Sequence, residues 1–133
     1  MIRTVYLDSC IAIYLVEEHP LYCAGIEESL AKLKGIVCYS PLTELECLVL
    51  PLRGKRLDLL EKFRRFFEIN VPLPMPVMVY REAARLRAAF GLKTPDALHL
   101  ATARFHDCSE LWTNDDRLAA VAEGRALNMI RPG

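Results

Sequence analysis

The sequence predicts an α/β domain with a central parallel sheet of four to five strands flanked by helices on both faces. Short apolar segments suited to strands alternate with longer amphipathic segments suited to helices, the order typical of parallel sheets. The chain has 133 residues, of which 53% are hydrophobic, enough for one domain with its own core. We see no linker, internal repeat or low-complexity tract, and expect one domain over residues 1–133.

In the first half of the chain, hydrophobic periodicity predicts two strands among four helices. Ser40 and Pro41 suit the cap and the first turn of the third helix, which carries leucines and a valine at helical spacing. The predicted elements are a strand over 2–7, helices over 10–18 and from Pro20 to Leu33, a strand over 36–39, a helix from Pro41 to the break at Gly54, and a basic amphipathic helix over 56–67.

The second half begins with a proline-rich connector. Three prolines in residues 70–76 remove hydrogen-bond donors, so this stretch supplies at most a short edge strand. The remaining predicted elements are a helix over 77–90 that ends at Gly91, a deeply buried helix that Thr94 caps and Pro95 begins, a strand at 111–112, a helix that Asn114 caps and that runs to about residue 123, and a last strand over 127–130.

Charge is unevenly distributed along the chain. The net charge is zero, but residues 53–93 carry a net charge of +6 and the remainder carries −6. A basic middle beside an acidic remainder suits a protein that attracts a polyanion and holds a metal ion with carboxylates. Solvated helix faces would give the same pattern, and taken alone the charge distribution favours that plainer interpretation.

Cysteine usage and hydropathy indicate the compartment. The five cysteines have no metal-binding spacing, so we expect free, buried or half-buried thiols in a reducing environment. His99 has no second soft ligand in evidence and is interpreted as a core or rim residue rather than a zinc ligand. The chain has neither a signal peptide nor an apolar stretch near the ~18 residues of a membrane span. We expect a cytoplasmic protein with no membrane partner.

Carboxylates occur at three corners of the predicted fold. Asp8 ends the first strand, Asp115 follows the strand at 111–112, and Asp96 lies in the first turn of the buried helix. Each could simply cap or begin a helix. However, the carboxyl ends of parallel strands share one edge of the sheet, where ligands bind. Carboxylates gathered there repel one another, and a hard divalent cation such as Mg²⁺ or Mn²⁺ relieves that repulsion.

A fourth acid would complete such a site, and two candidates lie on one helix. Glu44 and Glu46 flank an apolar stripe centred on Leu45, Val49 and Leu52. They lie on opposite sides of that stripe, each about 100° away. Helical periodicity therefore does not choose between them.

Four segments, taken in order, resemble the PIN-domain ribonucleases. They are Asp8-Ser9, Thr43-Glu44-Leu45, Thr94-Pro95-Asp96-Ala97 and Thr113-Asn114-Asp115. Within that family, the compact size and the string TPDALHLATA resemble VapC-type toxins of toxin–antitoxin pairs. The likeness covers essentially the whole chain. One departure is Cys10, at a position where the family often has Asn.

The resemblance implies a PIN-like domain and a Mg²⁺- or Mn²⁺-dependent endoribonuclease, the toxin of a type II toxin–antitoxin system. The family's helix acid falls in a Thr/Ala-Glu-Leu pattern, which maps to Glu44 rather than Glu46. The implied catalytic acids and metal ligands are Asp8, Glu44, Asp96 and Asp115. The implied supporting residues are Ser9 and Thr113, together with Asp116, which is a spare ligand or, in the favoured interpretation, only a helix-start acid.

RNA is the substrate that the resemblance implies. A metal ion lowers the pKa of water at such a site, and the family's products carry 5′-phosphate and 3′-hydroxyl ends. Basic residues would bind the flanking phosphates with an affinity that falls as salt rises. The candidate RNA-binding residues are Arg53, Lys55, Arg56, Arg85 and Lys93.

The resemblance also implies protein partners. A cognate antitoxin would bind near Ile13, Tyr14 and Leu45–Val49, and a homodimer would use exposed Phe66, Phe67 or Leu50. The alternative is a catalytically silent PIN-fold module that only binds an antitoxin-like partner or RNA. Metal-dependent cleavage separates the two hypotheses.

Overall fold

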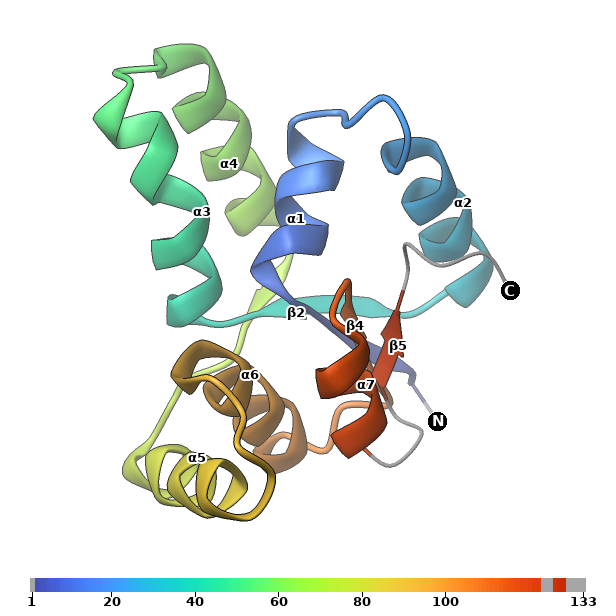
Figure 1. Cartoon of the computed structure of the whole chain (residues 1–133). Helices are drawn as coiled ribbons and strands as arrows, with labels where there is room; N and C mark the ends of the chain where they lie inside the picture. The colour runs from blue at the N-terminus through green and yellow to red at the C-terminus, as the bar shows by residue number, and fades with distance from the viewer. Residues whose placement is uncertain (1, 123–125, 129–133) are drawn as a thin grey trace.

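The sheet is parallel throughout and has helices on both faces, as predicted (Figure 1). A computed structural model of the chain describes residues 2–122 and 126–128. The strand order is β3-β2-β1-β4-β5, so β1 lies at the centre and pairs with β2 on one side and β4 on the other. The strands are β1 (Thr4–Leu7), β2 (Ile36–Tyr39), β3 (Val71–Pro72), β4 (Glu110–Thr113) and β5 (Ala126–Asn128).

Two layers of helices cover the two faces of this sheet (Figure 1). Side chains of β1 alternate between them: Val5 and Leu7 face the core beneath α1 to α4, whereas Tyr6 faces the core beneath α5 to α7. The helices are α1 (Ser9–Val16), α2 (Cys23–Leu33), α3 (Pro41–Arg53), α4 (Leu57–Ile69), α5 (Val77–Phe90), α6 (Thr94–Phe105) and α7 (Asp116–Val121).

Most element bounds agree with the sequence prediction to within about two residues, at both ends of helices and strands, and α2 begins at Cys23 rather than at Pro20. The N-cap of α7 is Asp115 rather than Asn114, because the Asp115 carboxylate accepts the backbone N–H groups of Arg117 and Leu118. Helix α6 includes Thr94, and its N-cap is Lys93, which makes no side-chain capping bond. The predicted ends at residues 123 and 129–130 lie outside the described residues.

The apolar stripe of α3 does not face the core. Leu45 is 60% exposed and Leu52 59%. The buried side of the helix instead carries Thr43, Cys47 and Pro51. Ser40 caps the helix as predicted and forms a reciprocal capping box with Thr43, which draws the Thr43 side of the helix inward.

The predicted dimer surface is only partly exposed. Phe66 and Phe67 are each 8% exposed and pack around Tyr39 in the core beneath α4, so neither can form an exposed surface. Leu50 is 68% exposed. Helix α4 buries Phe66 and Phe67 because their spacing places them on the same face as Phe63.

The cysteines and the lengths of the helices were also considered in the sequence analysis. All five cysteines are free thiols, and only Cys10 is partly exposed. Within residues 2–122 and 126–128, the helices are too short or too polar to cross a membrane.

Candidate functional site

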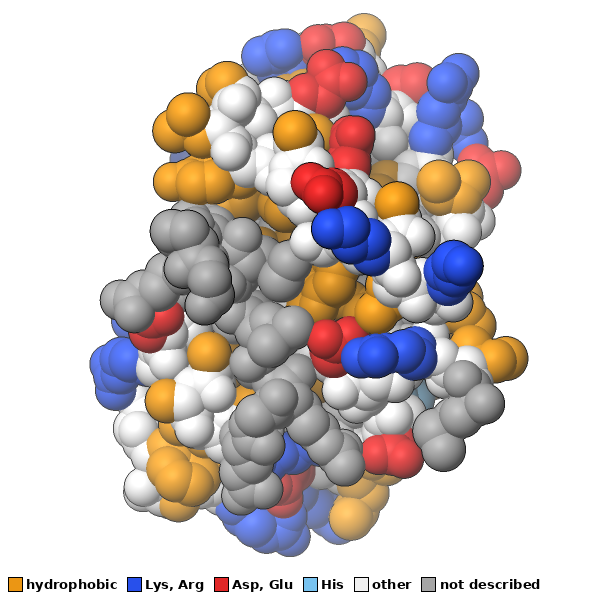
Figure 2. All heavy atoms as spheres, turned by 90° about the vertical axis from the view of Figure 1, so that its right-hand side faces the viewer, with side chains coloured by type: hydrophobic (Ala, Val, Ile, Leu, Met, Phe, Trp, Pro, Cys, Tyr) orange, Lys and Arg blue, Asp and Glu red, His pale blue; other side chains and the backbone are white. Residues whose placement is uncertain are grey.

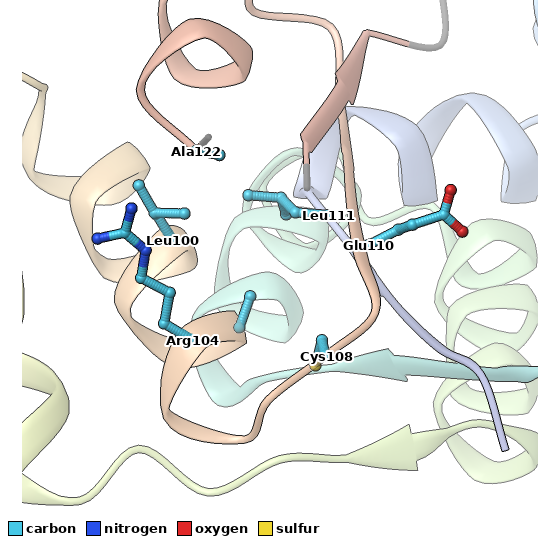
Figure 3. A pocket seen from close by; sticks show the side chains of 7 residues that line it. Leu100, Arg104, Cys108, Glu110, Leu111 and Ala122 are labelled. Carbon is cyan, nitrogen blue, oxygen red and sulfur yellow. The ribbon is translucent and has the colours of Figure 1, made fainter. Parts of the chain in front are cut away.

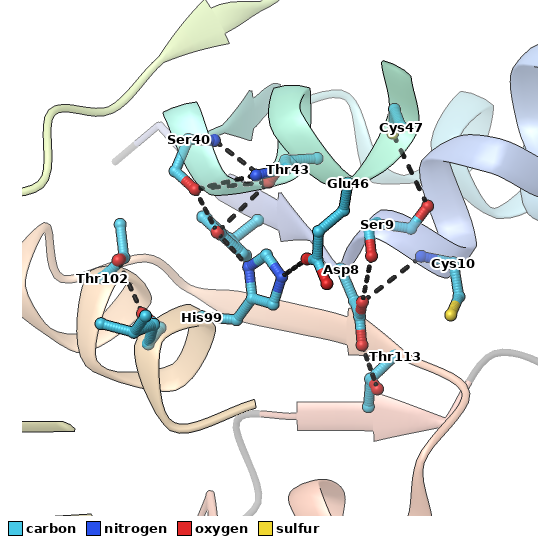
Figure 4. A network of polar contacts seen from close by, with 12 residues as sticks. Asp8, Ser9, Cys10, Ser40, Thr43, Glu46, Cys47, His99, Thr102 and Thr113 are labelled. Atoms are coloured by element: carbon cyan, nitrogen blue, oxygen red, sulfur yellow. Dashed lines mark hydrogen bonds and ion pairs between the residues drawn. The ribbon is translucent and has the colours of Figure 1, made fainter. Parts of the chain in front are cut away.

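Asp8 is held rigidly where β1 ends and α1 begins. Its side chain is buried, with 5% of the residue exposed. Oδ2 accepts a hydrogen bond from the Thr113 hydroxyl at 2.8 Å, and Oδ1 accepts from the Ser9 hydroxyl and the Cys10 backbone N–H, both at 3.3 Å (Figure 4). Thr113 ends the neighbouring strand β4 and is fully buried. The structure therefore brings the two predicted supporting residues, Ser9 and Thr113, onto the same carboxylate.

Asp96 and Asp115 lie together beside Asp8. They line a cleft of about 90 Å³ with Leu92, Lys93 and Arg117. The pKa of Asp96 is raised, first by partial burial, then by the negative charges of Asp8 and Asp115, although nearby His99 opposes the shift. The three predicted aspartates thus lie within electrostatic reach of one another.

Asp116 plays a different part from its neighbour Asp115. Asp115 caps α7 through Oδ1, which accepts the Arg117 N–H at 2.8 Å, and its own N–H donates to the Thr113 hydroxyl. Asp116 is the first residue of that helix and is exposed. This placement agrees with the favoured interpretation of Asp116 as a helix-start acid.

The fourth acid that the structure brings to this site is Glu46 rather than Glu44. Glu46 follows Thr43 by three residues, so the two share the inward side of α3 (Figure 4). Its negative charge contributes to the raised pKa of Asp96. Glu44 is exposed on another side of the helix. The family pattern led to Glu44 because it matches Thr-Glu-Leu locally, whereas contacts of Thr43 with Tyr6 and of Glu46 with His99 place the other side of α3 inward.

Two further polar residues of the site were missed by sequence reasoning. His99, on α6, is 1% exposed, and its Nε2 lies 2.6 Å from Oε1 of Glu46. Its Nδ1 bonds the hydroxyl of Tyr6, a buried residue of β1. The spacing of His99 three residues after Asp96 was visible in the sequence, but the contact with Tyr6 joins segments 93 residues apart.

The donor set suits a hard divalent cation, although its oxygens are already engaged. Within residues 2–122 and 126–128, no three His, Cys, Asp or Glu side chains converge closely enough to hold a metal ion as they stand. Asp8 bonds Thr113 and Ser9, Asp115 caps α7, and Glu46 bonds His99. A cation would compete with these contacts. The ligand chemistry nevertheless fits, because carboxylate oxygens are what Mg²⁺ and Mn²⁺ bind, and a cation would relieve the effects of burial and of the Asp8 and Asp115 charges that raise the pKa of Asp96.

The predicted basic residues are spread over the surface and differ in their surroundings. Lys93 lines the cleft with Asp96, and Arg117, which the sequence prediction missed, lines it as well. Arg56 pairs with Asp58, and Arg85 pairs with Glu82. Arg53 and Lys55 are exposed near the end of α3. On the face in Figure 2, Lys and Arg side chains are interspersed with Asp and Glu rather than gathered in one patch.

Another cavity lies away from the acids, beside the beginning of β4. It is lined mainly by apolar side chains of α6 and β4, including Leu100 and Leu111, with Arg104 and Glu110 at its edge (Figure 3). Its volume of about 10 Å³ is that of a packing defect. The acidic edge of the sheet is therefore the stronger candidate for a functional site.

Comparison with known proteins identifies the fold family. The PIN domain family model matches residues 5–124. The structure is similar to a toxin–antitoxin complex from Klebsiella pneumoniae, with a TM-score of 0.76, 22% identity, and coverage of 94% of this chain and 97% of that chain. VapBC2 from Rickettsia felis, bound to a DNA fragment from its promoter, gives a TM-score of 0.76 at 17% identity, with coverage of 93% and 97%.

A third similar structure is VapC20 from Mycobacterium tuberculosis, a toxin that cleaves the sarcin–ricin loop. Its TM-score is 0.72 at 13% identity, with coverage of 87% of this chain and 93% of that chain. The search of curated proteins gave no match. At these identities the structural likeness establishes the fold alone, but the family model spans most of the sequence. The chain belongs to the PIN domain family.

Proposed function

We propose that this protein is a Mg²⁺- or Mn²⁺-dependent endoribonuclease, the toxin of a type II toxin–antitoxin pair that acts in the cytoplasm. The observation that carries the proposal is the convergence of carboxylates from separate segments at one edge of the sheet. Burial and the charges of Asp8 and Asp115 raise the pKa of Asp96, so these groups are held together against their repulsion. The acids proposed to hold the ion are Asp8, Glu46, Asp96 and Asp115, with Glu46 in place of Glu44.

Each acid has a separate task in this proposal. Asp8 is fixed by Thr113 and Ser9, so its carboxylate is preorganised and little entropy is lost when it binds a cation. Burial and the neighbouring charges disfavour the Asp96 anion, which would therefore be stabilised by a nearby positive charge. A divalent ion held there supplies Lewis-acid stabilisation of the phosphodiester and activation of water.

The cleft must also accept a polyanion despite its acids. Lys93 and Arg117 line it beside Asp96 and Asp115, and both can bind backbone phosphates that flank the scissile bond. Exposed Arg53 and Lys55 are further candidates for phosphate contacts, whereas Arg56 and Arg85 already pair with acids. Single-stranded or looped RNA is the substrate that best fits an open cleft on a protein edge.

Protein partners follow from the surface of α3. Leu45, Val49 and Leu52 form an exposed apolar stripe beside the acidic edge, and exposed apolar stripes of this kind mark interaction surfaces. The similar structures from Klebsiella pneumoniae and Rickettsia felis are toxin–antitoxin complexes. We propose an antitoxin on this stripe and a homodimer through a surface that includes Leu50.

Cleavage of a mixed tRNA and ribosomal RNA pool tests the enzyme proposal. Purified protein is incubated with Mg²⁺, Mn²⁺ or EDTA, alongside Asp8→Asn and Asp96→Asn variants. We expect discrete fragments with 5′-phosphate ends that require the metal and disappear in both variants. Cleavage that persists in EDTA and in both variants would refute the metal site. A folded protein that cleaves in neither metal would favour the silent binding module.

A further inference from the structure

A buried chain of hydrogen bonds runs from the centre of the sheet to Glu46 (Figure 4). The Tyr6 hydroxyl lies 2.7 Å from Oγ of Ser40 and 2.5 Å from Nδ1 of His99. On the other side of the imidazole, Nε2 lies 2.6 Å from Oε1 of Glu46. Tyr6, Ser40 and His99 are each at most 1% exposed. The chain therefore joins β1, the start of α3 and α6 out of reach of water.

Hydrogen-bond chemistry determines which nitrogen of His99 carries a proton. Nε2 of His99 lies within hydrogen-bonding distance of the Glu46 carboxylate, at 2.6 Å from Oε1. An ionised carboxylate only accepts hydrogen bonds, so Nε2 of His99 must be the donor. The Tyr6 hydroxyl forms a hydrogen bond with Nδ1 of His99, and it also forms hydrogen bonds with the Ser40 and Thr43 hydroxyls.

Stability alone does not require this arrangement. Replacing both partners of a buried hydrogen bond by apolar groups of the same shape is nearly neutral, so Phe at Tyr6 and Leu at His99 would pack the same space. Glu46 is the member of the chain that reaches solvent, with 27% of its side chain exposed, and it lies within electrostatic reach of Asp96. The buried members thus fix the position of one carboxylate at the candidate site.

We propose that His99 is a positioning residue, held in register by Tyr6, that presents an N–H to Glu46 and so orients this carboxylate for the divalent cation. The inference rests on the proposed function, because it assumes that Glu46 is a metal ligand. Partners that orient ligands in this way typically change metal affinity by about 10–100-fold when removed.

A double-mutant cycle on Mn²⁺ affinity, measured by calorimetry without RNA, tests the proposal. The proteins are the wild type, His99→Leu, Glu46→Gln and the double variant. We expect His99→Leu to weaken Mn²⁺ binding by about tenfold or more. In the Glu46→Gln background the same change should have no further effect, since His99 acts through Glu46. Losses that simply add would overturn the proposal.

Two matched variants separate orientation from packing. Gln at position 99 retains an N–H donor near the Nε2 position, so His99→Gln should recover most of the affinity that His99→Leu loses. Thr102 lies on the same helix, and its fully buried hydroxyl donates to the Leu98 carbonyl of that helix, so Thr102→Val should leave Mn²⁺ affinity unchanged. A His99→Gln variant as weak as His99→Leu, or a comparable loss in Thr102→Val, would overturn the positioning role.

Tyr6→Phe gives an independent readout if His99→Leu does not fold. In long-range ¹H–¹⁵N spectra of the wild type, we expect the His99 proton on Nε2. Removal of the Tyr6 hydroxyl should perturb the His99 Nδ1 signal and weaken Mn²⁺ binding. A wild-type ring that carries its proton on Nδ1 alone, or a Tyr6→Phe variant with unchanged affinity, would overturn the proposal.

The outcomes also separate this proposal from the enzyme assignment. A protein that shows the expected cycle but cleaves no RNA retains the positioning role and loses the nuclease function. A protein that cleaves RNA with Mn²⁺ while the two losses add retains the nuclease function and loses the positioning role. A wild-type protein that binds no Mn²⁺ overturns both.

Discussion

The inward and outward sides of α3 differ in a way that reverses the usual hydrophobic pattern. The inward side carries small and polar groups, Thr43, Glu46 and Cys47, whereas the outward side carries Leu45 and Val49. The inward side joins the hydrogen-bond chain that leads to Glu46, so its polar groups are satisfied where they are buried. The outward side leaves large apolar groups for a partner. Periodicity alone locates the large apolar groups, but it does not determine which side is buried.

The largest expected effect comes from neutralising Glu46, on the inward side of α3. Glu44, on another side of the same helix, provides the matched control. Glu46→Gln removes a proposed metal ligand and should lower kcat/KM for RNA cleavage by about 100-fold or more, which corresponds to ~3 kcal/mol of lost transition-state stabilisation. Glu44→Gln, two residues away and exposed, should change it less than about threefold. Steady-state cleavage of one defined fragment measures both. If Glu44→Gln is the more damaging change, the assignment from the family pattern is right and ours is wrong.

Metal binding should stabilise the fold through the carboxylates of the candidate site and not through Glu44. An ion that binds only the folded state adds about 2.7 kcal/mol to the free energy of unfolding at 100 times its dissociation constant. We expect this gain with Mn²⁺ in the wild type and in Glu44→Gln, and its loss in Asp8→Asn. Urea denaturation with and without Mn²⁺ gives the comparison. An equal gain in Asp8→Asn would show that the ion binds elsewhere.

The two sides should also differ in their contribution to stability. Thr43→Val removes a hydroxyl that joins the capping box and contacts Tyr6, so we expect a loss of about 1–2 kcal/mol in the free energy of unfolding. Leu45→Ser changes a larger side chain, but one that is 60% exposed, and should cost less than about 0.5 kcal/mol. Equal losses in urea denaturation would mean that the outward stripe is buried in solution, for example in a dimer.

The smallest expected effect concerns the repulsion around Asp96. Burial and neighbouring charges raise its pKa above the ordinary value of 3.8, so the folded state holds this proton to higher pH than the unfolded state does. Stability from this group therefore falls as pH rises through the folded pKa. Asp96→Asn should be more stable than the wild type at neutral pH, by less than about 1 kcal/mol because the group is half exposed.

That difference should disappear as the pH falls well below 3.8, where Asp96 is protonated in both states of the wild type. Thermal unfolding of the two proteins across this range, without divalent metal, checks the sign. A variant that is less stable than the wild type at neutral pH would show that the charge of Asp96 mainly stabilises the first turn of α6.

Sequence reasoning located the strands and the three aspartates well, because both follow from local patterns. The run Ile36 to Tyr39 is apolar and bounded by Gly35 and Ser40, and β2 has those bounds. The aspartates follow strand ends or begin a helix, and a parallel sheet places strand ends on one edge. The family resemblance, rather than a local pattern, identified Ser9 and Thr113 as supporting residues, and both bond Asp8.

Local patterns did not favour Glu46 over Glu44, and they did not indicate the proposed positioning role of His99. The side of α3 that faces inward depends on where Tyr6 and α6 lie, and both are distant in sequence. Phe66 and Phe67 were expected at an exposed dimer surface because the family resemblance implies a dimer, yet they fill the core next to Tyr39. Sequence reasoning missed Arg117, which lines the cleft. The expected cap of α7 was Asn114, whereas the cap in the structure is Asp115.

The bond between Thr113 and Asp8 spans 105 positions of the chain, and it has a consequence for the synthesis of the protein. A ribosome makes Asp8 well before it makes Thr113. Until β4 has left the exit tunnel and paired with β1, Asp8 lacks both the Thr113 hydroxyl and the adjoining Asp115. Domains fold as units as they emerge, at about 5–20 residues per second. A nascent chain, or one cut short before β4, thus lacks both the bond from Thr113 to Asp8 and the Asp115 carboxylate, so the candidate site is complete only after β4 has been synthesised.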